Sequence, residues 1–254
     1  MVELLPGERL DEINENLKLI QRKNGLMFGT DAYLLAACLK SAKAQTGAEL
    51  GAGTGVVSLL ALSRGKFEKI FAIEAQQSFA SLVARNAVLN GCEDRLVFMH
   101  RDVRDIKETD LGGRVDIVFS NPPYMSVGAG KENLADEKNI ARREVLGGID
   151  DFCACASRIL KYGGSFYTVY RPERLCDLFE ALRANRLEPK RLTFVHGDVA
   201  TQPGMVLVMS RMGGNPSLEV TRPLIVYRSP EEKEYTDDMK KIYETCSFDG
   251  LEGF

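Results

Sequence analysis

Five consecutive residues, Ser120 to Tyr124 (SNPPY), carry the groups needed to hold a planar amino group. They follow an apolar, β-branched run at residues 115–119, which predicts a buried strand that ends at two prolines. Proline fixes its own φ angle and restricts the residue before it to extended conformations, so the loop is stiff. The side-chain amide of Asn121, the carbonyl of Pro122 and the ring of Tyr124 are therefore presented together. A structural, proline-rich turn in which the Tyr124 ring is only a packing residue would have the same sequence. The motif alone therefore does not distinguish a binding site from such a turn.

A glycine-rich turn lies upstream of this loop. Residues 48–55 (AELGAGTG) predict a short strand that runs into three alternating glycines, and residues 56–62 continue as an apolar helix. Glycine permits a tight turn, lets a ligand approach the backbone and leaves helix N–H groups accessible. The turn departs from the dinucleotide-binding pattern G-x-G-x-x-G, because its sixth position is Val56. Turns of this kind also occur for packing alone.

Two more predicted strands end in a carboxylate. Glu74 ends the run 70–74, 19 residues beyond Gly55, and Asp102 follows the run 95–99. A carboxylate at the end of the second strand can accept both hydroxyls of a ribose, although it also suits the start of the following helix. The carboxyl ends of parallel strands meet at one edge of a sheet, where ligands bind. We therefore expect the glycines, Glu74, Asp102 and Asn121 to converge there.

The remaining pattern predicts an α/β fold with a single doubly wound, Rossmann-like sheet of seven strands, mostly parallel, with an antiparallel edge strand. Residues 1–30 are expected to form an extended or hairpin-like N-terminal extension, and residues 31–254 one domain. Thr30 and Asp31 are expected to cap a helix over residues 32–39. The later segments predict helices at 150–160, 173–184 and 236–243, and strands at 164–170, 192–196, 205–209 and 224–227.

Composition narrows the function classes. With 44% hydrophobic residues and a net charge of -3, the chain has material for a core and is not expected to coat nucleic acid indiscriminately. A signal peptide and a membrane span are not apparent, so a cytoplasmic protein is expected. The six cysteines are scattered and the two histidines isolated, which predicts no metal site. The polar segment 125–146 is expected to be a flap that contacts substrate.

With these motifs in this order, the chain resembles the class I S-adenosylmethionine-dependent methyltransferases that act on amino groups. The resemblance spans roughly residues 15–170, and four motifs carry it: residues 49–55, Glu74, the pair Asp102 and Val103, and residues 121–124. Residues 21–36, with FGTDA at 28–32, are similar to the bacterial tRNA(Val) adenine-37 N6-methyltransferase family. The chain has Arg142-Arg143-Glu144 where that family has Arg-His-Glu.

The resemblance implies a class I methyltransferase fold, S-adenosylmethionine as cofactor and tRNA as partner, without a metal or a membrane. It implies methyl transfer to the exocyclic N6 of an adenine in RNA, adenine 37 of tRNA(Val). The catalytic groups would be the side-chain oxygen of Asn121, the carbonyl of Pro122 and the stacking ring of Tyr124. Arg142 and Arg143 would contact the substrate together with Tyr124. The cofactor would be held by Glu49, Gly51, Gly53, Glu74, Asp102, Val103 and Asn121.

Other functions remain open at this point. The amide of a protein glutamine, as in a release factor, presents the same two N–H bonds as adenine. However, enzymes that methylate it carry a helical domain before the glycine turn, and only 48 residues precede Glu49. Methylation of another amino group in RNA or DNA is a further alternative. A binding module with this fold would be expected to lose Asp102, Asn121 or Tyr124, and all three are present.

Overall fold

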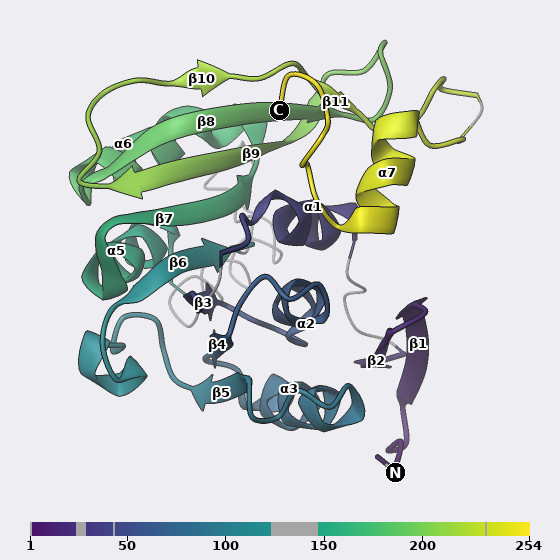
Figure 1. The fold of residues 1–254 in the computed structure, drawn as a ribbon, viewed down its shortest axis with the longest axis vertical. Helices are drawn as coiled ribbons and strands as arrows, with labels where there is room; N and C mark the ends of the chain where they lie inside the picture. Colours follow the sequence, from purple (N-terminus) through teal and green to yellow (C-terminus); the bar gives the residue numbers. More distant parts are fainter. Residues whose placement is uncertain (1, 24–28, 43, 123–146, 232) are drawn as a thin grey trace, which may run out of the picture.

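The computed structural model describes residues 2–23, 29–42, 44–122, 147–231 and 233–254. Its centre is a mostly parallel sheet whose long strands lie in the order β5-β4-β3-β6-β7-β9-β8 (Figure 1). The strands are β3 (Thr46–Leu50), β4 (Lys69–Glu74), β5 (Leu96–His100), β6 (Val115–Ser120), β7 (Leu160–Tyr170), β8 (Leu187–His196) and β9 (Pro203–Met212). The predicted α/β fold with a doubly wound, mostly parallel sheet is confirmed.

The far edge of the sheet differs in detail from the sequence expectation. The antiparallel strand is β9, which pairs with both β7 and β8 and so lies inside the sheet and not at its edge. Two short strands, β10 (Glu219–Val220) and β11 (Leu224–Ile225), pair in parallel with β8. In the described part of the chain the sheet therefore has nine strands, including these two. They cover backbone groups of β8 that would otherwise stand unpaired at an edge.

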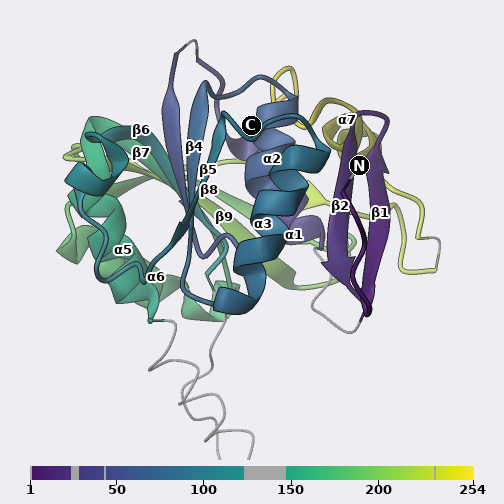
Figure 2. The ribbon, with the colours of Figure 1, turned by 90° about the horizontal axis from the view of Figure 1, so that it is seen from below.

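Helices cover both faces of the sheet (Figure 2). On one face lie α1 (Thr30–Cys38), α2 (Val56–Ser63) and α3 (Gln77–Leu89), and on the other α5 (Ile149–Ile159) and α6 (Leu175–Ala184). Short 3-10 turns occur at η1 (Glu108–Leu111) and η2 (Pro172–Arg174). Each face has its own apolar core, which explains why the strands read as continuous apolar runs. Within the described ranges, every helix is too short or too polar to span a bilayer.

The N-terminal hairpin, β1 (Glu8–Asn14) and β2 (Leu17–Arg22), forms a separate two-stranded sheet, as the hairpin-like prediction expected. It packs against α3 through side-chain amides. The Ile20 N–H donates to Oδ1 of Asn86 at 2.7 Å, and Nδ2 of Asn86 donates back to the Ile20 carbonyl at 3.1 Å. Asn90, one turn later, contacts the backbone of Lys18 in the same two ways. Along the side of β2 that faces α3, two asparagine side chains thus make the kind of backbone hydrogen bonds that a neighbouring strand would make.

The start of α1 differs from the sequence expectation. The helix begins at Thr30, and its N-cap is Gly29, which has no side chain to cap it. The expectation that Thr30 and Asp31 cap the helix is therefore wrong, since both lie within its first turn. α7 (Asp237–Thr245) fixes this turn: the Tyr33 hydroxyl donates to the Tyr243 carbonyl at 2.6 Å, and the two ring centroids are 4.7 Å apart. The carboxylate of Asp31 accepts a hydrogen bond from the side chain of Asn121.

Candidate active site

The ends of three adjacent strands are level with one another. Leu50 of β3 pairs with Ile73 of β4 on one side and with Ser120 of β6 on the other. The Ser120 hydroxyl donates to the Leu50 carbonyl at 2.7 Å, which ties the end of β6 to that of β3. One residue further along each strand come Gly51, Glu74 and Asn121. The structure therefore brings the glycine turn, the second-strand carboxylate and the amide to one edge of the sheet, as expected.

The glycine turn needs its glycines for two different reasons. Gly53 and Gly55 both have left-handed φ angles, 54° and 80°. A Cβ on Gly55 would meet Val83 at 3.3 Å, so that glycine also serves packing against α3. A Cβ on Gly53 would meet no atom within 4 Å. The backbone at Gly53 therefore borders open space, where a ligand can approach it closely.

Glu74 braces this turn. Its side chain is buried, with the residue only 4% exposed, and both oxygens accept backbone N–H groups. Oε2 accepts from Gly53 at 2.9 Å, and Oε1 accepts from Gln76 at 2.7 Å. Because Gln76 is the N-cap of α3, the carboxylate also lies at the start of that helix. Each carboxylate oxygen has a second lone pair, so Glu74 can hold the turn and still accept from a ligand.

Glu49 is directed toward α2. Its Oε2 accepts from the backbone N–H of Ser58 at 3.1 Å and from the Ser58 hydroxyl. The residue is 3% exposed, and burial raises the pKa of the Glu49 carboxyl to about 8, against the opposing effect of the Ser58 hydrogen bonds. At neutral pH this carboxyl is therefore mostly protonated in the folded protein.

Asp102 follows β5 and is held by an arginine two residues later. Its Oδ1 accepts from the backbone N–H and Nε of Arg104, at 2.8 and 2.9 Å, and its Oδ2 accepts from Nη2 at 2.6 Å. These hydrogen bonds keep the pKa of Asp102 below its usual value. Val103 is buried, and its carbonyl accepts from Arg158 at 2.8 Å. Arg104 and Arg158 are contacts of the site that the sequence pattern does not predict.

Asn121 makes a contact across 90 residues of sequence. Its Nδ2 donates to Oδ2 of Asp31 at 2.8 Å, and Pro122 beside it is buried. The sequence pattern predicts Asp31 as a helix cap. The sequence feature that points to a role for Asp31 in the site is the FGTDA stretch at 28–32, which is similar to the methyltransferase family. Tyr124, Arg142 and Arg143, together with the expected flap at 125–146, lie outside the described residues.

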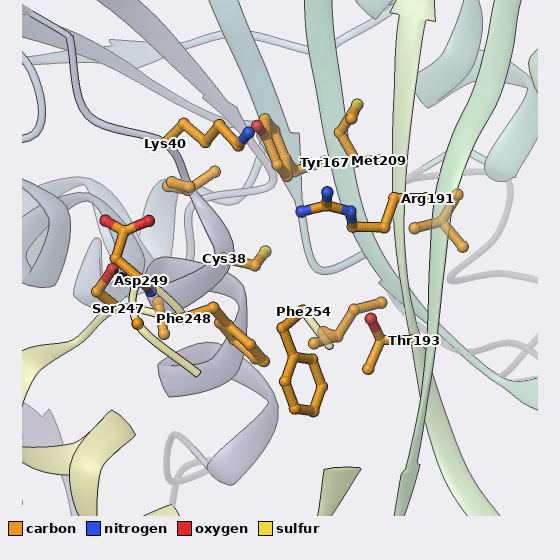
Figure 3. Close-up of a pocket in the computed structure, with 15 residues that line it drawn as sticks. Cys38, Lys40, Tyr167, Arg191, Thr193, Met209, Ser247, Phe248, Asp249 and Phe254 are labelled. Carbon is orange, nitrogen blue, oxygen red and sulfur yellow. Dashed lines mark hydrogen bonds between the residues drawn. The ribbon is translucent and has the colours of Figure 1, made fainter. Parts of the chain in front are cut away.

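A cavity of about 190 Å³ lies elsewhere in the molecule (Figure 3). It is bounded by the C-terminal end of α1, by β7, β8 and β9, and by the segment after α7, and it includes Cys38, Tyr167, Arg191 and Phe254. It contains none of the site residues predicted from the sequence. Among the residues with described positions, no group of three or more His, Cys, Asp or Glu side chains is arranged to hold a metal.

The sequence pattern of the methyltransferase small domain family matches residues 24–185. The chain belongs to this family. It is thus a methyltransferase, and S-adenosylmethionine is its cofactor, as the sequence predicts.

Two relatives match this methyltransferase over most of its length, and both are named tRNA1(Val) (adenine(37)-N6)-methyltransferase. One, from a Flavobacteriaceae bacterium, is 26% identical over 207 residues, which covers 81% of this chain and 85% of the relative. The other, from Porphyromonas gingivalis, is 27% identical over 222 residues, covering 82% and 86%. A solved structure of a predicted O-methyltransferase from Agrobacterium tumefaciens has a TM-score of 0.69 at 22% identity, covering 85% of this chain and 97% of that one. This similarity confirms the methyltransferase fold.

Proposed function

We propose that this methyltransferase transfers a methyl group from S-adenosylmethionine to the exocyclic N6 amino group of an adenine in tRNA, adenine 37 of tRNA1(Val). One observation carries the proposal: the β3–β6 register sets Asn121 level with Gly51, so an amide that can bind an amino group lies beside the glycine turn that we propose holds the cofactor. The two relatives named for this reaction each match more than 80% of the chain, which supports the choice of acceptor.

The residues at the strand ends fit the cofactor. Gly53 offers backbone next to open space, and the buried carboxylate of Glu74 has acceptor capacity beyond its two backbone hydrogen bonds. We propose that Glu74 accepts the ribose hydroxyls. Asp102 and the backbone of Val103 would hold the adenine, with Asp102 using lone pairs not taken by Arg104. Glu49, Gly51 and Gly53 would hold the methionine part, and Asn121 would touch it from β6.

The proposed chemistry depends on positioning. When bound, the cofactor supplies a methyl group on a positively charged sulfur. The adenine N6 is a poor nucleophile, because its lone pair is delocalised into the ring. The carbonyl oxygens of Asn121 and Pro122 would accept its two N–H bonds, which favours a pyramidal nitrogen with a directed lone pair. We propose in addition that Tyr124 stacks on the base and that Arg142 and Arg143 contact the tRNA.

The test uses total tRNA from a strain that lacks this gene. The purified protein with S-adenosylmethionine should convert an adenosine to N6-methyladenosine, detected by mass spectrometry of nucleosides and located at position 37 of tRNA1(Val) by fragment mapping. A tRNA1(Val) transcript with guanine at position 37 is the matched control and should accept no methyl group. Methylation of a glutamine in a protein from the same strain, with tRNA unchanged, would contradict the proposal.

A further inference from the structure

We propose that Asp31 is a positioning residue that fixes which end of the Asn121 carboxamide faces the acceptor amine. The inference rests on the function proposed above and adds a residue of α1 to its machinery. The observation behind it is the 2.8 Å hydrogen bond from Nδ2 of Asn121 to Oδ2 of Asp31.

The chemistry of the two side chains makes this contact directional. A carboxylate has only acceptors, whereas a carboxamide has an NH2 donor at one end and an oxygen acceptor at the other. Facing Asp31, the amide has to direct its NH2 toward the carboxylate, because the flipped amide would place two acceptors against each other. The oxygen of Asn121 is then fixed at the opposite end. An amino group about to be methylated needs that oxygen, since it has hydrogens to donate.

Asp31 is itself held in place. The next six residues, 32–37, are buried in the core, so α1 cannot rotate freely. The first turn is also tied to α7, where the Tyr33 hydroxyl donates to the Tyr243 carbonyl at 2.6 Å. On the other side, a Cβ on Gly29 would lie 2.8 Å from Oδ1 of Asp31. Because Gly29 has an ordinary φ of -108°, a larger residue there would meet no backbone strain but would displace the Asp31 carboxylate.

Loss of Asp31 is expected to slow the chemical step. Loss of Asp31 removes the acceptor that favours one orientation of the Asn121 carboxamide, and the flipped orientation presents a donor to a donor. Asp31 is not among the residues proposed to hold the cofactor, and its variants keep the Asn121 side chain, so cofactor affinity should change little. The loss should therefore appear in kcat and not in the binding of S-adenosylhomocysteine.

The experiment compares Asp31→Asn and Asp31→Ala with Asn121→Ala in a double-mutant cycle. Each Asp31 variant should lower kcat about 10- to 100-fold, because misplacing a reacting group costs on that scale. The pair Asp31→Ala and Asn121→Ala should be no slower than Asn121→Ala alone, since Asp31 acts through Asn121. Thr30→Val, in the same turn, is the control, and its kcat should stay within twofold. Asp31→Asn and Asp31→Ala keep the Asn121 side chain, so the S-adenosylhomocysteine affinity of both, measured by calorimetry, should stay within twofold of wild type. Multiplicative losses in the double mutant, or an equal loss in Thr30→Val, would overturn the proposal.

A second readout does not depend on the substrate. The side-chain NH2 signals of Asn121, assigned by their absence in Asn121→Ala, should move in the NMR spectrum of Asp31→Ala and stay in place in Thr30→Val. If the wild-type protein leaves tRNA unmethylated, the proposed acceptor is wrong, and this spectrum still decides the role of Asp31. Unchanged Asn121 signals in Asp31→Ala would refute it.

Discussion

Two regions at opposite ends of α1 show how the proposed reaction site differs from a cavity in the fold. At the start of the helix, Asp31 meets Asn121, and the nearby polar groups stand at strand ends where backbone N–H groups hold them. At the end of the helix lies the cavity of about 190 Å³, bounded by side chains from segments far apart in sequence, among them Cys38 and Phe254. The cavity offers volume, whereas the strand ends offer converging donors and acceptors. We infer that convergence, and not volume, locates the chemistry.

One buried ionisable group from each region makes the same point. Near the cavity, Nζ of Lys66 donates to the carbonyls of Ala36, Ala37 and Leu39 at 2.8, 3.0 and 2.8 Å. An ammonium has three donors, so this contact is complete and serves to cap the end of α1. At the strand ends, each oxygen of Glu74 accepts one backbone N–H and retains a second lone pair. A buried charged group whose hydrogen-bonding capacity is fully used within the protein indicates a structural role. One that retains unused acceptors indicates a place for a ligand.

The largest effect that separates the two regions is expected from Glu74→Ala. The variant should bind S-adenosylhomocysteine about 30-fold more weakly, the equivalent of ~2 kcal/mol for hydrogen bonds to a charged group. Calorimetry measures this directly. The matched control is Glu68→Ala, which removes the same charge from an exposed position just before β4 and should leave affinity unchanged. Equal affinity in Glu74→Ala and wild type would remove Glu74 from the proposed ribose site.

A pH-dependent effect on stability is expected from Glu49→Gln. Burial raises the pKa of Glu49 to about 8 in the folded protein, from 4.5 in a solvent-exposed side chain. Between these values the folded protein binds a proton that the unfolded chain has lost, so the free energy of unfolding should fall as pH rises from about 5 to 8. The glutamine side chain of the variant has no proton to exchange in this range. The melting temperature of the variant relative to wild type should therefore rise over this range, by about 2–4 °C per kcal/mol.

The control for that experiment is Glu68→Gln, at an exposed position. Its melting curve should follow that of wild type at every pH from 5 to 8. If the Glu49→Gln and wild-type melting temperatures also changed in parallel, the carboxyl of Glu49 would be ionised in the folded protein, and burial would not govern its titration.

The features that depend on residues adjacent in the chain could be predicted from the sequence. Strands followed at once by glycine, carboxylate or amide could be recognised, because the carboxyl ends of parallel strands meet whatever the rest of the chain does. The partner of Asn121 could not, because Asp31 is 90 residues away and has the same residue type as a helix cap. The place of β9 was missed for a similar reason. Its antiparallel pairing with β8 is evident from two successive strands, but its insertion beside β7 depends on contacts distant in sequence.

The smallest effect is expected in the cavity, from Arg191→Met. Arg191 lines the cavity and pairs with Glu219 at 3.1 Å, with the two side chains 33% and 62% exposed. Pairs this exposed contribute about 0–1 kcal/mol, so the melting temperature should fall by no more than roughly 2–4 °C. Affinity for S-adenosylhomocysteine should stay within twofold of wild type. Glu219→Gln breaks the same pair from outside the cavity and should match Arg191→Met in both measurements. A tenfold loss of cofactor affinity in Arg191→Met alone would place the cofactor in the cavity, and the distinction between the two regions would be wrong.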